Sequence, residues 1–242
     1  IKHTLEKRKS DAQLAEQRKN DLIVYLAHDL KTPLTSVIGY LTLLRDEPQI
    51  SPELRCRYTG IALEKAERLE SLINEFFDIT RFNLTTPTLE KEQIHLSRML
   101  EQLASEFHPI LAERELRWRL KIMSDIMLVG DADKLARVFD NLIRNAANYS
   151  YVGTEICLCA QTEADIVKIM RKNHGNTIPP DTLDHIFEQL YTADASRSSA
   201  TGGAGLGLAI AKEIVELHGG AITAASANES TIFIVTFPVT NE

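Results

Sequence analysis

The sequence predicts two unlike parts: an all-α helical hairpin that forms a dimeric four-helix bundle, followed by an α+β sandwich. Between residues 21 and 79, apolar side chains recur at alternating spacings of three and four, as in bundles and coiled coils. After residue 88, strand-like segments and amphipathic helices are mixed without regular βαβ order, which favours helices over one face of a mixed sheet. The composition, 44% hydrophobic and 25% charged, is typical of a globular protein.

The helical part follows a charged segment, residues 1–20, which contains no Gly or Pro and is predicted to be a helical linker. Two apolar seams come next, separated by the turn residues DEPQISP. Two helices with a short loop make an antiparallel hairpin, which cannot enclose a core alone. We therefore expect residues 21–86 to form a homodimeric four-helix bundle that covers both seams. The seams comprise Ile23, Leu26, Leu30, Leu34, Val37, Leu41 and Leu44, then Tyr58, Ala62, Lys65, Leu69, Leu72, Phe76 and Ile79.

The second part, residues 88–242, begins after the helix-breaking segment TTPT. Its apolar patterns predict helices over residues 95–113, 132–148, 181–190 and 206–217. Strands are predicted over residues 118–122, 126–129, 154–161, 165–172, 221–225 and 231–237. Gly219 and Gly220 are expected to end the last helix as its C-cap.

Charge and cysteine content exclude several classes. Lys and Arg total 27 against 34 Asp and Glu, and the net charge of −7 argues against a nucleic-acid binder. No run of about 18 apolar residues is present to span a bilayer. The cysteines, Cys56, Cys157 and Cys159, form no disulfide framework and indicate a reducing cytosol. Cys157 and Cys159 share a strand face and are expected to be ordinary buried thiols rather than metal ligands.

One string in the first helix, AHDLKTPL at residues 27–34, carries chemistry. His28 stands outside the apolar seam, where a neutral imidazole is a competent nucleophile near pH 7. Asp29 can orient the imidazole or take its proton, and Thr32 lies one turn along on the same face. Pro33 removes a helical N–H donor, so we expect a kink there. A surface histidine beside a structural kink is the simpler alternative.

The predicted helix 132–148 carries polar side chains opposite its apolar stripe. Asn141, Asn145 and Asn148 recur at i, i+4 and i+7, with Arg144 beside them and Tyr149 at the helix end. Asn oxygens are hard ligands that suit Mg²⁺ beside phosphate oxygens. A solvated polar face is the alternative interpretation.

Two loops add candidate phosphate and base contacts. The glycine-rich segment 202–208 (GGAGLGL) runs into a helix, where backbone N–H groups favour anions. Asn173 and Gly175 follow a strand, where an amide could bond a base edge and a glycine could allow close approach. Each loop alone would be an ordinary surface turn, and no P-loop motif occurs.

Taken in order, these segments resemble the sensor histidine kinases of two-component signalling. HDLKTP resembles their phosphoacceptor motif, DNLIRNA their N box, IFEQLY their F box and GAGLGL their G2 box. The likeness runs from about residue 21 to residue 237. The stretches YLAHDLKTPLTSVIGYL and ASRSSATGGAGLGLAIAKEI are most similar to the VanS type, from glycopeptide (vancomycin) resistance operons.

The resemblance implies a HisKA dimerisation and phosphotransfer domain and a GHKL-type ATP-binding domain with a mobile lid. It implies that His28 attacks the γ-phosphate of ATP through Nε2, assisted by Asp29, and passes the phosphoryl group to an aspartate of a response regulator. Thr32 would position water to dephosphorylate that regulator. The chain would be the cytoplasmic region of a membrane-anchored sensor, with residues 1–20 as its signalling linker.

The resemblance also implies a nucleotide site. Asn145 would hold Mg²⁺ with Asn141 nearby on the phosphates, Tyr149 would pack near the adenine, and the glycines would wrap the phosphates. The full predicted binding set is Asn141, Arg144, Asn145, Asn148, Tyr149, Asn173, Gly175, Gly203, Gly205, Leu206 and Gly207.

Several positions depart from the family pattern. The G1 motif normally reads D-x-G-x-G, but Asn173 replaces the acidic residue and Thr177 the second glycine. Asn148, Leu190 and Thr192 also stand where other residues are usual, and the glycine-rich turn at residues 228–231 is missing. We predict slow kinase activity with phosphatase activity. The alternatives are a degenerate kinase acting as a phosphatase or scaffold, and a GHKL ATPase of the chaperone or mismatch-repair kind using Asp140.

Overall fold

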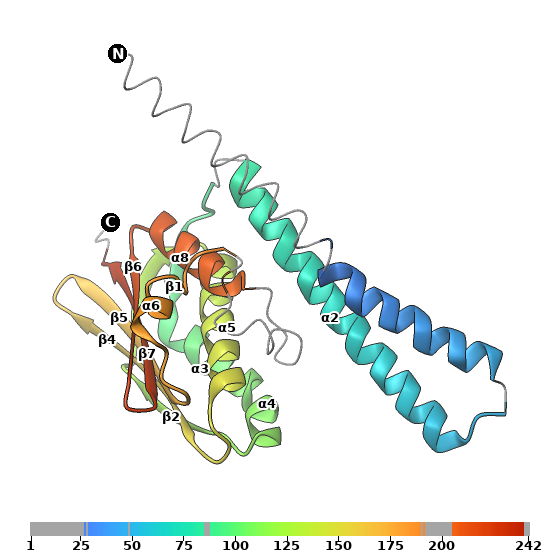
Figure 1. The fold of residues 1–242 in the computed structure, drawn as a ribbon. Helices are drawn as coiled ribbons and strands as arrows, with labels where there is room; N and C mark the ends of the chain where they lie inside the picture. Colours follow the sequence, from blue (N-terminus) through green and yellow to red (C-terminus); the bar gives the residue numbers. More distant parts are fainter. Residues whose placement is uncertain are drawn as a thin grey trace. The chain divides into compact units, whose positions relative to one another are not determined.

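The computed structural model describes residues 27, 29–47, 49–84, 88–189, 191 and 205–239. These residues belong to two compact units, Ile1–Leu84 and Thr85–Glu242 (Figure 1). His28, Leu190, Thr192 and Gly203, which the sequence singled out, lie outside the described residues.

The first unit is an antiparallel helical hairpin. Its first helix covers residues 29–46, and the second, α2, runs from Pro52 to Leu84. Pro52 needs no helical hydrogen bond at the first position, and Ser51 Oγ accepts from the N–H of Leu54 at 3.3 Å, so the sequence begins α2 sharply. The rings of Tyr40 and Tyr58 lie 5.4 Å apart between the two helices. The prediction of two long helices is confirmed in the described part.

The first apolar seam does not all face the second helix. Leu30, Val37 and Leu44 are half-buried. Leu34, Ile38 and Leu41 form another face, at i, i+4 and i+7, and stay 44%, 56% and 53% exposed. A single hairpin therefore leaves a wide apolar stripe uncovered.

The second unit is built on a five-stranded sheet in the order β2-β4-β5-β7-β6. Its strands are β2 (Arg117–Ile122), β4 (Glu155–Glu163), β5 (Ile166–His174), β6 (Ala221–Ala227) and β7 (Ser230–Pro238). β2 pairs with β4 in parallel and every other pair is antiparallel, so the sheet is mixed, as the sequence predicts. A separate antiparallel pair joins β1 (Glu92–His95) to β3 (Met127–Gly130).

Helices pack on one face of this sheet (Figure 1). They include α3 (Leu96–Glu106), α4 (His108–Glu113), α5 (Ala132–Tyr149) and α8 (Gly207–Leu217), while α6 (Pro180–Leu183) is a single turn. Alternate residues of β5 and β7 are buried, which is the period expected for strands covered on one face. The predicted architecture of helices over one face of a mixed sheet is confirmed.

Two predicted helices are wrong in detail. The one expected over residues 95–113 is preceded by β1 and interrupted at the buried Phe107, because Pro109 has no N–H to continue the ladder of α3. The one expected over residues 181–190 is helical only to Leu183. Beyond it the chain turns so that Ile186 is buried and Phe187 meets the core ring of Phe233.

The start of α5 is tied to the end of α8. Asp131 caps α5, accepting from the N–H of Lys134 at 3.1 Å. The Asp131 N–H donates to His218 Nε2 at 3.0 Å, and His218 Nδ1–H donates to the Ile214 carbonyl at 2.7 Å, which requires the neutral tautomer. Burial lowers the pKa of His218. Gly219, at φ +74°, ends α8 as predicted, and the two helices are held in fixed register.

Candidate functional site

The polar face of α5 meets the start of α8. A Cβ added to Gly207 would lie 3.2 Å from Asn141 Oδ1, so only glycine allows this close approach without displacing the amide. Within the described part of the chain, the buried Nδ2 of Asn141 has no hydrogen-bond partner. A buried amide donor beside a helix start is a group that a ligand oxygen can satisfy.

The N-terminus of α8 supplies further donors. Gly205, at φ +71°, turns the chain, and the buried Leu206 precedes the helix without a side-chain cap. The first-turn N–H groups of this 11-residue helix therefore have no capping side chain, which is the arrangement that binds phosphate. Gly207 is thus brought to Asn141, Gly205 and Leu206 directly precede it in the chain, and Gly203 lies outside the described residues.

The turn after β5 lies against the end of α5. A Cβ on Gly175 would stand 2.0 Å from the carbonyl oxygen of Tyr149, so a side chain at position 175 would clash with the backbone of α5. The N–H of Tyr151 donates to the His174 carbonyl at 2.8 Å and fixes the same approach. Tyr149 is 48% exposed beside this turn, and Asn173 lies near the end of β5, two residues before Gly175, so the three predicted base-site residues lie close to one another.

The turn after β5 makes side-chain contacts, one of them at Thr177, which stands where the family has its second G1 glycine. Thr177 Oγ1 accepts from the N–H of Glu229 at 2.9 Å, and Tyr151 donates its hydroxyl to Asn176 Oδ1 at 2.8 Å. Asn228 and Glu229 form the β6–β7 hairpin with positive φ at both residues, the geometry of a type I′ turn. These departures therefore join two adjacent turns into one rigid edge.

A residue that sequence reasoning missed lies at the centre of the site. Arg171, 1% exposed, donates from Nη2 to Asn145 Oδ1 at 3.0 Å and from Nη1 to Asn173 Oδ1. Its guanidinium stacks 4.4 Å from the ring centre of Phe233. In the described residues it has no acidic partner. Burial lowers its pKa to about 9, which leaves it charged at neutral pH. The sequence did carry one signal for Arg171, because a cation stands there at an inward-facing position of the strand predicted over residues 165–172.

Other predicted residues have different surroundings. Arg144 Nε pairs with Asp140 Oδ2 at 2.8 Å, and its guanidinium lies 5.2 Å from the ring centre of Phe107, between α3 and α4. Asn148 is half-buried. In the helical unit, Asp29 is half-buried, and Thr32 is exposed with its carbonyl accepting from Ser36 Oγ at 3.2 Å.

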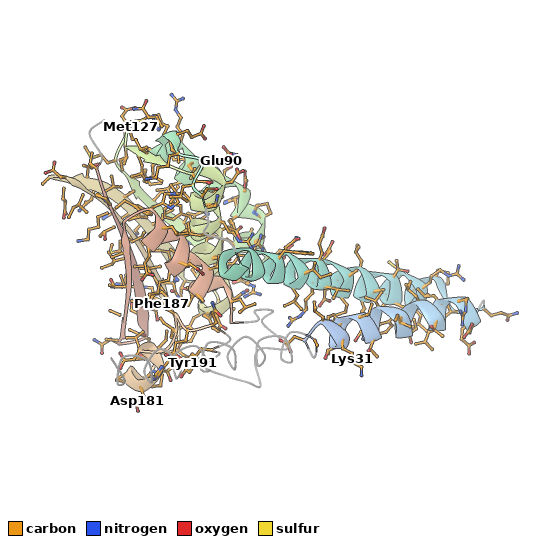
Figure 2. The ribbon with its side chains drawn as sticks, turned by 90° about the horizontal axis from the view of Figure 1, so that it is seen from above. Lys31, Glu90, Met127, Asp181, Phe187 and Tyr191 are labelled. Carbon is orange, nitrogen blue, oxygen red and sulfur yellow. The ribbon has the colours of Figure 1, made fainter. Side chains whose placement is uncertain are left out.

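The F-box segment packs on the same sheet. Phe187 meets Phe233 edge to face at 6.0 Å, and Lys212 Nζ of α8 lies 5.9 Å from the centre of the Phe187 ring. Figure 2 places Asp181, Phe187 and Tyr191 at one side of this unit, with Glu90 and Met127 at the other. The segment that enters the predicted lid is therefore anchored by aromatic contacts to the core.

The hydrogen-bond donors of this site fit the phosphates of a nucleotide, whereas few side-chain oxygens remain to coordinate a metal. In the described residues, no group of three or more His, Cys, Asp or Glu side chains is placed to hold a metal. Asn145 Oδ1 has two lone pairs, of which Arg171 takes one, so one remains for Mg²⁺.

Two of the three cysteines lie side by side in β4. The Sγ atoms of Cys157 and Cys159 lie 3.4 Å apart on one sheet face, and both residues are half-buried rather than buried as expected. Cys56 is exposed. Burial raises the pKa of Cys159 to about 11, so this thiol stays protonated at neutral pH.

Comparisons with known families identify both units. A model of the His Kinase A (phospho-acceptor) domain matches residues 18–84. A model of the histidine kinase-, DNA gyrase B- and HSP90-like ATPases matches residues 130–241, which implies that the second unit binds ATP.

None of the helices among the described residues is long and apolar enough to cross a membrane.

Curated relatives align with nearly all of the chain. The sensor protein VanSC of Enterococcus gallinarum is 57% identical over 227 residues, covering 94% of this chain and 63% of the relative. The sensor protein VanS of Enterococcus faecium is 52% identical over 238 residues, covering 98% and 62%. The chain thus spans a little under two thirds of these relatives.

Solved structures share the fold. The histidine kinase AdeS of Acinetobacter baumannii superposes with a TM-score of 0.72 at 21% identity, covering 88% of this chain and 98% of that one. The histidine kinase ThkA in complex with the response regulator protein TrrA gives a TM-score of 0.72 at 22% identity, covering 97% and 65%.

Proposed function

The chain belongs to the sensor histidine kinases, with a phospho-acceptor hairpin followed by an ATPase domain, and on that premise we propose that it phosphorylates itself on His28 at the expense of ATP. The observation that carries this proposal is the meeting of the Asn-bearing face of α5, the uncapped start of α8 and the turn after β5 in one place. Together they offer donors for phosphates beside a base site.

Each of these elements has a defined task. The α8 N–H groups and Asn141 Nδ2 bind the phosphate oxygens, and the remaining lone pair of Asn145 Oδ1 is available to Mg²⁺. When bound, Mg²⁺ neutralises charge on the phosphates during transfer. Tyr149 and the turn at Gly175 border the base.

The phosphoryl transfer itself uses the helical unit. The Nε2 lone pair of His28 forms a bond to the γ-phosphorus while the bond to the ADP oxygen breaks. Asp29 orients the ring or takes the Nδ1 proton as the imidazole gains charge. The phosphoryl group then moves to an aspartate carboxylate of a response regulator, and Thr32 positions a water that hydrolyses the regulator's acyl phosphate.

The uncovered stripe of the first helix supports a homodimer. Leu34, Ile38 and Leu41 are exposed in a single hairpin, as are Leu63 and Phe77 of α2. A second hairpin with the same stripes covers them in a four-helix bundle. We include this dimer in the proposal.

The identity to VanS-type sensors supports a role in a glycopeptide-resistance response. We propose that the chain is the cytoplasmic region of a membrane-anchored sensor, on the strength of its likeness to the sensor proteins VanSC and VanS. A GHKL ATPase that uses Asp140 as its catalytic acid is disfavoured, because Arg144 already pairs with that carboxylate.

The proposal is tested with ATP radiolabelled on the γ-phosphate. We expect label on the wild-type chain and on an added receiver domain, and background label on His28→Gln. His108→Gln, an exposed histidine of α4, is the matched control and should label like wild type. Steady ATP hydrolysis without label on the chain would favour the ATPase alternative, and loss of label from a phosphorylated regulator alone would favour a phosphatase or scaffold.

A further inference from the structure

Cys157 and Cys159 lie on the face of the sheet that the helices leave open. Between and beside them in β4 the alternate residues are buried, and Ile156 packs in one core cluster with Ala146 and Ala147 of α5. Because side chains of a strand alternate between its faces, the two cysteines point away from the helices (Figure 1). Both are half-buried, and their Sγ atoms lie 3.4 Å apart. Two thiols therefore contact each other at a surface that a small molecule reaches.

The two thiols hold their protons differently. Burial, the hydrogen bond with Cys157 and the negative charge of Cys157 raise the pKa of Cys159 to about 11. The charge of Cys157 acts on Cys159 only once Cys157 is a thiolate, so Cys157 ionises first and Cys159 donates its S–H to it. Lys172 of β5 stands in register with Cys157, and Lys121 of β2 with Cys159. Cations beside a pair of thiols favour the thiolate, which is the nucleophilic form.

We propose that Cys157 and Cys159 form a peroxide-reactive dithiol that closes reversibly to a disulfide on the open face of the sheet. The Cys157 thiolate attacks one oxygen of hydrogen peroxide, the O–O bond breaks, and the departing hydroxide takes a proton from solvent to become water. The sulfur of Cys159 then attacks the sulfenic acid on Cys157, and the S–O bond breaks as a second water leaves with the Cys159 proton. The two sulfurs lose two electrons in total, and the peroxide oxygens gain them.

The place of the pair in a strand makes the disulfide easy to reduce. Residues i and i+2 of a strand have Cα atoms roughly 6.6–6.8 Å apart, since each residue rises by about 3.3–3.4 Å. Disulfides usually join Cα atoms about 4.4–6.8 Å apart and most often about 5.5–6 Å apart, so this bond forms at the far end of the accepted range. Bonds stretched in this way are the ones that thiol reductants reopen.

The test exposes the full chain to hydrogen peroxide, blocks the remaining thiols with N-ethylmaleimide and digests the protein with trypsin. Cleavage after Arg144 and Lys168 gives one peptide, residues 145–168, that holds both cysteines, whereas Cys56 lies elsewhere. We expect this peptide to carry no maleimide and to be lighter by two hydrogen atoms. Reduced glutathione, added before the blocking step, should restore two maleimides. Cys56→Ser, at an exposed single thiol, is the control and should leave this result unchanged.

A second variant identifies the thiol that reacts first. In Cys159→Ser the sulfenic acid on Cys157 has no thiol to resolve it, so dimedone should label Cys157, and Cys157→Ser should take up severalfold less dimedone at Cys159. Three results would overturn the inference: a peptide that keeps both maleimides while Cys56 of the same molecule is oxidised, added oxygen on either cysteine without the loss of two hydrogens, or disulfides that join two chains instead of Cys157 to Cys159.

Discussion

Replacing Arg171 with methionine should change the stability of the second unit very little, although the residue is fully buried and donates hydrogen bonds from both Nη atoms; its buried Nε has no partner among the described residues. Burial lowers the pKa of the guanidinium from 12.5 to about 9, which at about 1.36 kcal/mol per pKa unit disfavours the buried charge by about 5 kcal/mol. Hydrogen bonds from a charged donor contribute about 1.5–3 kcal/mol each, and the stacking on Phe233 about 1–2 kcal/mol. These contributions nearly cancel.

Methionine keeps most of the volume without the charge, so we expect Arg171→Met to lie within about 1.5 kcal/mol of wild type. Arg171→Ala also opens a cavity and should lose about 3 kcal/mol. Urea unfolding followed by Trp118 fluorescence measures both, because Trp118 is the one tryptophan of the chain and bonds the Ala104 carbonyl within this unit at 2.8 Å. A loss above about 3 kcal/mol in Arg171→Met would refute the reasoning, since the charge would then be a net stabiliser.

Three other predictions follow from single residues. Burial lowers the pKa of His218, so the stability that its neutral ring contributes to folding is complete above pH 6.5 and is lost as the pH falls below 6.5. His218→Gln should therefore make the free energy of unfolding, measured by urea titrations at several pH values, depend less on pH. An unchanged pH dependence would contradict this prediction. Gly175→Ala should weaken ATP binding at least tenfold, since its Cβ would displace the Tyr149 carbonyl; Gly60→Ala, in open space on α2, is the control, and equal affinities would exclude this role. Ala164 has φ +51° in the β4–β5 turn, so Ala164→Gly should raise the free energy of unfolding by up to about 1 kcal/mol, and a loss would show that its strain is negligible.

Sequence patterns predicted most of the fold because they reflect local physics. The apolar period of α5 and the glycine pair after α8 were sufficient to place those elements. β1 was missed because EQIH has too few apolar residues to alternate, and it forms only by pairing with β3. The break at Phe107 is caused by Pro109, a local signal that the apolar period over residues 95–113 outweighed in the prediction.

The candidate site was predicted in part. Of the predicted residues, Asn141 lies beside Gly207, Tyr149 lies beside Gly175, and Asn145 is joined to Asn173 through Arg171, whereas Arg144 pairs with Asp140. The role of Arg171 could not be inferred from spacing, because its contacts join Asn145 and Asn173, which come from different elements. The first apolar seam likewise seemed to be one continuous interface, whereas the hairpin divides it between an inner face and an exposed stripe.

The phosphorylated position itself gives the most direct test of the central claim. Peptides of the chain incubated with ATP and Mg²⁺, kept at alkaline pH because phosphohistidine is acid-labile, can be mapped by tandem mass spectrometry. We predict one phosphoryl group, on His28, and its loss in Asn145→Ala. Phosphate on another residue, or undiminished phosphate on His28 in that variant, would contradict the account.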